Sequence, residues 1–258
     1  MTTGIMAAMH DEIAELIKLI SEQDESTVCR VGTRDFYLGK LEGQPCVIVL
    51  AGIGKVAAAC TAMTLIQRFC VSEIVFTGLA GGLADHIRVG DVVVADKLIQ
   101  HDMDARPLFP RYEIPLTGIA EFTVSEPLRK RMQDAARHFF EHDIQNHIDD
   151  AAMTQFGLSA PEVHIGMIAS GDQFIGAVQT VARLREELPA ACAVEMEGAA
   201  VAQVCHEYGV PCTVIRTISD RANDVAHIDF LPFLKQIASK YSSAIVRNYL
   251  SAAARQPW

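Results

Sequence analysis

The chain has 258 residues, half of them hydrophobic and 21% charged, a size that allows one α/β domain with a substantial core, so we expect a single domain over residues 1–258. A formal net charge of -10, without a basic stripe to offset it, argues against nucleic acid as a partner. The longest apolar runs are interrupted well short of a bilayer-spanning length, which predicts a soluble protein with no membrane association.

Strand-like and helical patterns alternate from the N-terminus onward. The opening run MTTGIMAAMHDE has no basic segment and reaches acids at Asp11 and Glu12, so it indicates a first strand rather than a signal peptide, and we expect a cytoplasmic protein. A helical pattern, DEIAELIKLI, follows it. In RDFYLGKLEGQPCVIVL two strand-like runs flank a Glu-Gly-Gln turn, which predicts an antiparallel hairpin.

The later strand-like runs are continuous apolar stretches rather than an in-out alternation. Such runs indicate strands that are buried on both faces. The sequence therefore predicts a three-layer α/β/α fold in which a central mixed β-sheet is flanked by helices. In chain order, the runs and the helical patterns between them are PCVIVLAG, GKVAAACTAMTLIQRF, SEIVFTGLAGG, VVVADKLI, VHIGMIASGD, AVEME, GAAVAQVCHEY, PCTVIRTISD and a final long helix from about Phe230.

Two segments are less regular. Three prolines between Asp102 and Gly118 predict a long excursion loop, of a kind that often serves function or an interface. Residues 129–157 have a helical period but are dense in His and Asp, and we interpret them as a solvated helical pair at the periphery rather than a metal cluster. The seven cysteines include no C-x-x-C pair, so neither a disulfide framework nor a zinc site is indicated.

Ligands of open α/β sheets bind beyond the carboxyl ends of strands, so the residues there are the candidates for chemistry. In AGIGKVAAA, Gly52, Gly54 and Ala57 satisfy a loose dinucleotide-binding pattern. NAD is disfavoured, because the next strand ends in Thr77 and Gly78 rather than in the acid that such a site needs. The loop is either a tight turn or a place where backbone approaches a small ligand. The glycines of TGLAGG likewise allow a tight turn or a sugar lying against the main chain.

The run AVEMEGAA carries two acids, Glu195 and Glu197, in apolar surroundings. Each would cost on the order of several kcal/mol if it were buried without partners. If a strand ends at these acids and a helix begins after them, both carboxylates lie at a pocket mouth, near helix N-terminal amides that stabilise their charge. One of them can instead simply cap the helix, and Glu197 is the nearer to the helix start.

The run VIRTISD ends the last predicted strand. The strand period of two places Arg216, Ile218 and Asp220 on one face, with Ser219 on the other and able to cap or orient Asp220. An acid beside a low-dielectric wall can have its pKa raised enough to donate a proton near neutral pH. The alternative is a structural ion pair between Arg216 and Asp220.

These motifs, in this order, resemble the 5′-methylthioadenosine/S-adenosylhomocysteine nucleosidases of the nucleoside phosphorylase superfamily, over Gly4 to about Leu234. The resemblance implies a mixed β-sheet surrounded by helices and a homodimer in which the proline-rich loop of one subunit reaches the pocket of the other. It implies hydrolysis of the N-glycosidic bond of adenine nucleosides in methionine salvage, with no metal and no cofactor. The motifs are AGIGKVAAA, TGLAGGL, RVGDVVV, HDMD, SGDQFI, AVEMEGAAVAQVC and RTISDRAND.

The resemblance also implies roles for individual residues. Glu12 resembles the base that activates the hydrolytic water, and Asp220 the acid that protonates adenine N7. Glu197 resembles the residue that holds the ribose hydroxyls, with Met196 beneath the sugar and Glu195 in support. Adenine leaves poorly unless it is protonated, so two acids on opposite faces of the bond are the least that this chemistry needs.

The other implied contacts surround the base and the 5′ group. Phe174 resembles the ring that stacks on adenine, and Ile175 the residue whose backbone reads the base edge. Ile53 and, from the neighbouring subunit, Phe109 resemble walls of the 5′-alkylthio pocket. The expected substrate-binding set is completed by Arg216, close to the attacking water, and by Ala80, Gly81 and Ser219.

Two departures from the family pattern stand out. Leu79 occupies the place of a small hydroxyl residue, which leaves the polar contacts of the nucleophile open, and residues 138–161 form a longer stretch than the family core. Two rival functions remain, phosphorolysis and a catalytically weak nucleoside-binding protein. Glu12 would repel a phosphate dianion, which favours hydrolysis, and the retained Glu12, Glu197 and Asp220 favour an enzyme.

Overall fold

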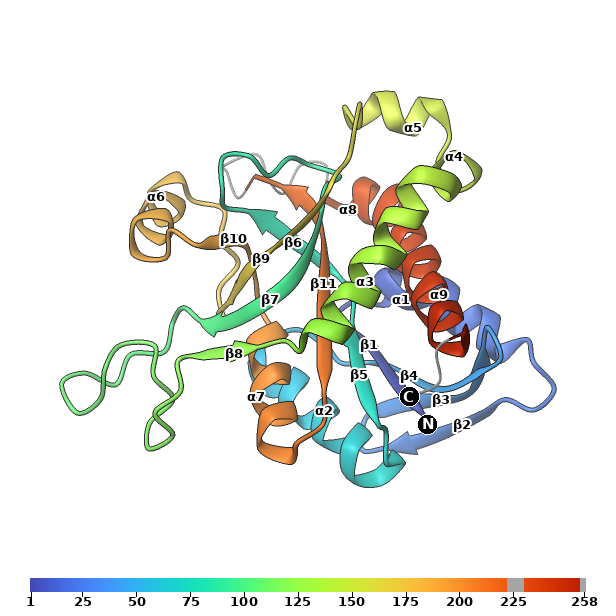
Figure 1. The fold of residues 1–258 in the computed structure, drawn as a ribbon, viewed down its shortest axis with the longest axis horizontal. Helices are drawn as coiled ribbons and strands as arrows, with labels where there is room; N and C mark the ends of the chain where they lie inside the picture. Colours follow the sequence, from blue (N-terminus) through green and yellow to red (C-terminus); the bar gives the residue numbers. More distant parts are fainter. Residues whose placement is uncertain (222–229, 256–258) are drawn as a thin grey trace.

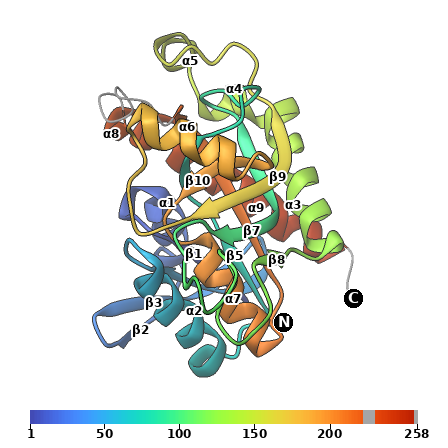
Figure 2. The ribbon, with the colours of Figure 1, turned by 90° about the vertical axis from the view of Figure 1, so that its left-hand side faces the viewer.

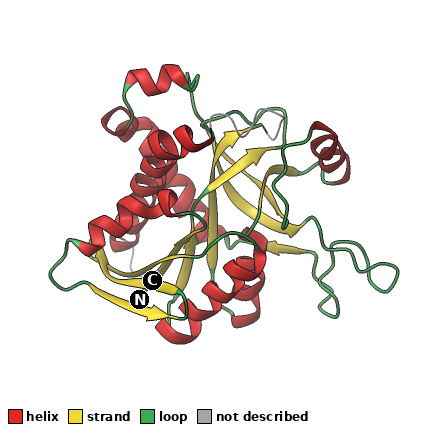
Figure 3. Ribbon diagram, turned by 180° about the vertical axis from the view of Figure 1, so that it is seen from behind, coloured by secondary structure: helices red, strands yellow, loops and turns green. Residues whose placement is uncertain are grey.

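The computed structural model describes residues 1–221 and 230–255, and its centre is a mixed β-sheet surrounded by helices (Figures 1 and 3). Within these residues the sheet has eleven strands, in the order β2-β3-β4-β1-β5-β11-β6-β10-β9-β7-β8. The fold class predicted from the sequence is confirmed. The strands are β1 (Thr3–Ala7), β2 (Thr27–Val31), β3 (Arg34–Leu41), β4 (Gln44–Leu50), β5 (Glu73–Phe76), β6 (Leu79–Gly82), β7 (Val92–Gln100), β8 (Glu121–Thr123), β9 (Val163–Ser170), β10 (Ala191–Glu195) and β11 (Cys212–Asp220).

Helices cover both faces of the sheet. On one face α1 and α3 each pack against α9, and on the other face α2 packs along α7. In the described ranges the helices are α1 (His10–Ser21), α2 (Lys55–Phe69), α3 (Glu126–His138), α4 (Ile144–His147), α5 (Asp150–Gln155), α6 (Val178–Glu187), α7 (Gly198–Tyr208), α8 (Phe230–Phe233) and α9 (Ser239–Arg255), with π-helical turns at Phe139–Asp143 and Leu234–Ala238.

Successive residues of the central strands face two different cores. In β1, Ile5 belongs to the core beneath α1, α3 and α9, whereas Met6 belongs to the core beneath α2 and α7. In β5, Val75 and Phe76 divide in the same way. All four side chains are fully buried. A strand that is buried on both faces has no polar side, which explains why these segments are continuous apolar runs in the sequence.

Strand β11 joins two parts of the sheet. It pairs in parallel with β5 over its first residues, antiparallel with β7 over Ile215–Thr217, and in parallel with β6 towards its end. The pairing with β7 closes strands β11, β6, β10, β9 and β7 into a ring, from which β5, β1, β4, β3 and β2 continue as an open sheet. In Figure 2, β7, β9 and β10 lie side by side, away from β2 and β3. This closure was not predicted from the sequence.

Some local predictions are confirmed and others need correction. The antiparallel pairing of β3 with β4 and the irregular course of residues 101–120 are as expected. The TGLAGG segment is more than a turn, because its last four residues form β6. Strand β2 adds an unpredicted edge strand beside the hairpin. Residues 129–157 are not a solvated helical pair, because α3 packs along α9 and buries Met132. Phe139, the residue that follows α3, is fully buried too.

Two further predictions concern the limits of the described chain. Residues 222–224, which end the RTISDRAND motif, lie outside the described residues. The C-terminal helical segment begins at Phe230, as expected, and continues through a π-helical turn into α9. No helix within the described ranges combines the length and the apolar character that a membrane crossing requires.

Candidate active site

The predicted carboxylates meet in one pocket of about 280 Å³, which we call the acidic pocket. Glu12, Glu197 and Asp220 all line it, although they come from α1, from the start of α7 and from the end of β11. Two expected site residues, Phe109 and Arg216, are not in the lining of the same chain. Its lining is Ala8, Met9, Glu12, Ile53, Leu79, Ala80, Gly81, Gln173, Phe174, Ile175, Val194, Glu195, Met196, Glu197, Ser219 and Asp220.

Five lining residues were not among the predicted site residues: Ala8, Met9, Gln173, Val194 and Leu79, the last noted only as a departure from the family pattern. Gln173 lies within the SGDQFI motif, and Ala8 and Met9 connect the first strand to Glu12, so the strand-end rule could have included all three. Val194 belongs to a strand interior, where composition gives no signal of a pocket.

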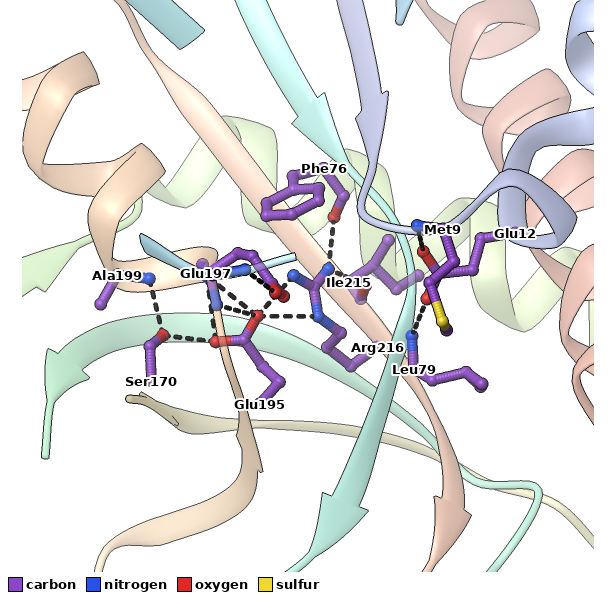
Figure 4. Close-up of polar contacts among 12 residues, drawn as sticks. Met9, Glu12, Phe76, Leu79, Ser170, Glu195, Glu197, Ala199, Ile215 and Arg216 are labelled. Carbon is purple, nitrogen blue, oxygen red and sulfur yellow. Dashed lines mark hydrogen bonds and ion pairs between the residues drawn. The ribbon is translucent and has the colours of Figure 1, made fainter. Parts of the chain in front are cut away.

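Glu12 is held in the first turn of α1 by backbone donors. Its Oε2 accepts a hydrogen bond from the Met9 N–H at 2.8 Å, and its Oε1 accepts one from the Leu79 N–H at 3.0 Å (Figure 4). The carboxylate lies so close to Gly78 that a Cβ at this glycine would be 2.9 Å from Oε1. Burial raises the pKa of Glu12 above its ordinary value, although these hydrogen bonds and the nearby Arg216 charge lower it.

Glu197 is bound by the glycine loop before α2. Its Oε1 accepts a hydrogen bond from the Gly54 N–H at 2.8 Å, and Gly54 has a φ of 96°, a conformation that favours glycine. The loose dinucleotide-binding pattern is therefore a turn that presents its amides to a carboxylate of the same chain. Burial and, to a lesser degree, the neighbouring Glu195 raise the pKa of Glu197 to about 7.

Glu195, not Glu197, caps helix α7. Its carboxylate accepts hydrogen bonds from the Glu197 N–H at 3.1 Å and from the Gly198 N–H at 2.9 and 3.0 Å. Ser170 also donates to it, and Ser170 in turn accepts from the Ala199 N–H at 2.7 Å. The sequence left open which acid caps the helix; although Glu197 is nearer the helix start, the side chain that caps it is Glu195, because the chain turns so that the strand-end acid lies beneath the first helical amides.

Arg216 forms its ion pair with Glu195. Its Nη2 lies 2.6 Å from Glu195 Oε2 and its Nε donates to the same oxygen at 3.2 Å. Its Nη1 donates to the carbonyls of Phe76 and Ile215, and the guanidinium lies 4.1 Å from the centre of the Phe76 ring. Arg216 is 1% exposed and lies behind the pocket wall, so its expected closeness to an attacking water remains a prediction.

Asp220 and Ser219 both line the acidic pocket, at the end of β11. Ser219 Oγ donates a hydrogen bond to Asp220 Oδ2 at 2.7 Å, so the expected orienting contact is present. The expectation that Ser219 faces the other side of the strand is wrong. The register of β11 against β6 shifts between Ile218 and Asp220, and this irregularity breaks the simple alternation of side chains.

The rim of the pocket is apolar and open. Phe174 and Ile53 line the pocket with 58% and 59% of their surface exposed, whereas Ile175 is buried. Phe109 lies in the irregular segment 101–120 and does not line the pocket of its own chain. Its contribution from a second copy, and the homodimer itself, stay predictions. Among the described residues, no group of three or more His, Cys, Asp or Glu side chains could hold a metal ion.

The raised pKa of Glu197 predicts a pH-dependent stability. Its ordinary pKa is 4.5 and its folded pKa is about 7, so the folded protein binds this proton more tightly than the unfolded chain. The free energy of unfolding of the ligand-free protein should therefore fall, by up to about 3 kcal/mol, as the pH rises through this range. Urea denaturation over the same range should show a flatter dependence for Glu197→Gln. The exposed Glu22→Gln is the control, and an unchanged slope in Glu197→Gln would refute the assignment.

Residues 2–251 match the model of the phosphorylase superfamily. The 5′-methylthioadenosine/S-adenosylhomocysteine nucleosidase of Geobacillus thermodenitrificans is 33% identical over 252 residues, covering 97% of each chain, and that of Staphylococcus haemolyticus is 35% identical over 248 residues, covering 96% of this chain and 98% of the relative.

Solved structures of related hydrolases have a similar fold. The Neisseria meningitidis nucleosidase in complex with methylthio-immucillin-A is 32% identical, with a TM-score of 0.83 over 97% of this chain and 99% of that one. A futalosine hydrolase mutant of Helicobacter pylori is 31% identical, with a TM-score of 0.81 over 97% of this chain and 99% of that one.

Proposed function

We propose that this chain, which belongs to the phosphorylase superfamily, hydrolyses 5′-substituted adenine nucleosides. Within the superfamily it belongs to the 5′-methylthioadenosine/S-adenosylhomocysteine nucleosidase family. Cleavage of a nucleoside N-glycosidic bond is the activity of the family. The proposed substrates are 5′-methylthioadenosine, S-adenosylhomocysteine and 5′-deoxyadenosine, and the products are adenine and the 5′-substituted ribose. The corresponding place in metabolism is methionine salvage and the recycling of S-adenosylmethionine by-products.

The observation that supports this proposal is the convergence of three carboxylates in the acidic pocket. In the proposed mechanism Asp220 donates a proton to adenine N7, which makes the base a better leaving group. Glu12 accepts a proton from the water that attacks the ribosyl carbon, and the negative charges around the sugar stabilise its developing positive charge. Glu197 accepts hydrogen bonds from the ribose hydroxyls, while Phe174 stacks on the adenine.

Water rather than phosphate is the proposed nucleophile. No lysine or arginine is among the described residues that line the acidic pocket, and the donors of Arg216 are directed at Glu195, Phe76 and Ile215. A phosphate dianion would therefore meet carboxylates, and no cationic side chain, among the described lining residues.

An assay of adenine release tests this choice of nucleophile. Purified protein should release adenine from 5′-methylthioadenosine at the same rate in phosphate-free buffer and in buffer with phosphate, and the sugar product should be free 5-methylthioribose. A strict requirement for phosphate, with a ribose-1-phosphate product, would make the chain a phosphorylase. Binding without any release of adenine would instead support a nucleoside-binding protein.

Futalosine-type nucleosides are the second candidate substrates, because a futalosine hydrolase of Helicobacter pylori has the same fold at 31% identity. The rim at Ile53, whose side chain is 59% exposed, leaves room for a larger 5′ group. A panel of 5′-methylthioadenosine, S-adenosylhomocysteine, 5′-deoxyadenosine and futalosine, compared by kcat/KM, ranks these alternatives.

A further inference from the structure

Three polar residues outside the acidic pocket form a closed set of contacts, which we call the Asp172 clasp: Lys55, Asp102 and Asp172. Asp172 Oδ1 accepts a hydrogen bond from the Lys55 N–H at 2.8 Å, and the Asp172 N–H donates to Asp102 Oδ2 at 2.9 Å. Lys55 Nζ lies 2.6 Å from Asp102 Oδ1 and 3.9 Å from Asp172 Oδ2. Each of the three residues therefore contacts the other two.

The clasp connects the two sides of the acidic pocket. Asp172 directly precedes Gln173, Phe174 and Ile175, which line the pocket on the side proposed to bind the base. Lys55 directly follows Gly54, whose N–H binds Glu197 on the side proposed to bind the sugar. Two successive amides at the start of α2 thus bind two carboxylates, one from each side.

The start of α2 is a favourable place for both negative charges. α2 has fifteen residues, and its N-cap residue, glycine, supplies no side-chain cap. The first amides of such a helix attract anions, so the two carboxylates complete the helix end as a capping side chain would. The fit is close, because a Cβ on Gly54 would come to 3.2 Å from Asp172 Oδ1.

The segment 171–175 has few other anchors. Gly171 donates to the Glu195 carbonyl at 3.1 Å, and Ile175 is buried at the other end. Between them the side chains of Asp172 and Phe174 are about half exposed, at 51% and 58%. Lys55, in contrast, is 15% exposed and also donates to Gln100 Oε1 at 3.1 Å, so the clasp attaches a loosely packed segment to a fixed one.

We propose that Asp172 is a positioning residue that couples base binding to sugar binding, by fixing the segment of Phe174 to the same helix start that fixes Glu197. The inference rests on the proposed function. Without the carboxylate, only the Asp172 N–H contact with Asp102 still joins this segment to Lys55, so the ring and Glu197 can shift relative to one another and the nucleoside loses the alignment that the reaction requires. Asp172 itself contacts neither the base nor the sugar in this scheme.

Two substitutions at Asp172 test the inference. Asp172→Ala should lower kcat/KM for 5′-methylthioadenosine about tenfold or more, the value of a charge-assisted hydrogen bond, with a fall in kcat as well as a rise in KM. Asp172→Asn keeps an oxygen acceptor for the Lys55 N–H and should recover most of the loss. Asp85→Ala, which removes an acid that is 89% exposed and outside the pocket lining, is the control and should match wild type. Wild-type kinetics in Asp172→Ala would overturn the inference.

A double-mutant cycle tests the coupling itself. In an Asp220→Asn background, which we expect to bind the nucleoside but cleave it far more slowly, the affinity for 5′-methylthioadenosine is measured by calorimetry with Asp172→Ala, with Glu197→Gln and with both. Coupling predicts that Asp172→Ala weakens binding less when Glu197 is already replaced. If the double variant loses affinity by the product of the two single-variant factors, the coupling is refuted.

The affinity for adenine alone separates this inference from the proposed function. If wild type binds adenine but cleaves no nucleoside, while Asp172→Ala binds adenine about tenfold more weakly, the clasp is upheld and the proposed function fails. If wild type cleaves nucleosides and Asp172→Ala changes neither adenine affinity nor kcat, the proposed function is upheld and the clasp fails. A wild type that binds neither adenine nor nucleoside would contradict both.

Discussion

Asp220→Asn is expected to slow adenine release by about 10²–10⁴-fold, the usual contribution of a general acid, while nucleoside affinity stays within a few-fold of wild type. Asparagine has the shape of aspartate and can keep the hydrogen bond that Ser219 Oγ donates at 2.7 Å, so the pocket is preserved. What it cannot do is transfer a proton to adenine N7. Single-turnover release of adenine, together with calorimetric binding of 5′-methylthioadenosine, measures the two effects separately.

One control variant and one further catalytic variant accompany this measurement. Asp85→Asn removes an acid that is 89% exposed and should leave turnover unchanged. Glu12→Gln should also slow the reaction, because it removes the proposed base. Turnover near the wild-type rate in Asp220→Asn would mean that another group protonates adenine, and would contradict the proposed role of Asp220.

Arg216→Met should destabilise the protein by about 3–5 kcal/mol, the cost of leaving a buried charge without its partner. Glu195 would remain beneath α7 with its hydrogen bonds to amides and to Ser170, but without the cation at 2.6 Å. Both side chains of this pair are almost completely buried, with 1% and 3% exposed. The free energy of unfolding in urea, measured without ligand, gives the effect.

A second ion pair of the same length provides the matched control. Arg247 Nε lies 2.6 Å from Glu42 Oε1, but these side chains are 41% and 30% exposed. Because solvent screens such a pair, Arg247→Met should cost less than about 1 kcal/mol. Equal losses in the two variants would show that burial does not set the value of the Arg216 pair.

The sequence predicted the parts of the site that depend on local pattern. Continuous apolar runs marked the buried strands, and the rule that ligands lie beyond strand ends directed attention to Glu12, Glu197 and Asp220, which do line one pocket. The family resemblance, rather than the spacing, supplied their proposed roles. The glycine loop before α2 was recognised as a backbone feature, although not as the binding partner of Glu197.

What the sequence could not give depends on contacts between distant segments. The pairing of β11 with β7, which closes the ring of strands, joins residues more than a hundred positions apart. The choice of Glu195 as the cap of α7 depends on how the chain turns and on Arg216 from another strand. The strand period also failed at Ser219, because a register shift between Ile218 and Asp220 breaks the alternation and leaves both Ser219 and Asp220 lining the pocket.

The bare backbone at Gly78 limits how this enzyme can be re-engineered. Even a methyl group there would come to 2.9 Å from Glu12 Oε1, closer than side-chain carbons are found to sit, and the neighbouring Leu79 amide keeps the carboxylate where it is. Every other amino acid has a Cβ, so every substitution at Gly78 would displace the Glu12 carboxylate. Enlarging the cavity for a bulkier 5′ group should therefore begin at the rim around Ile53, whose side chain is 59% exposed, rather than at Gly78.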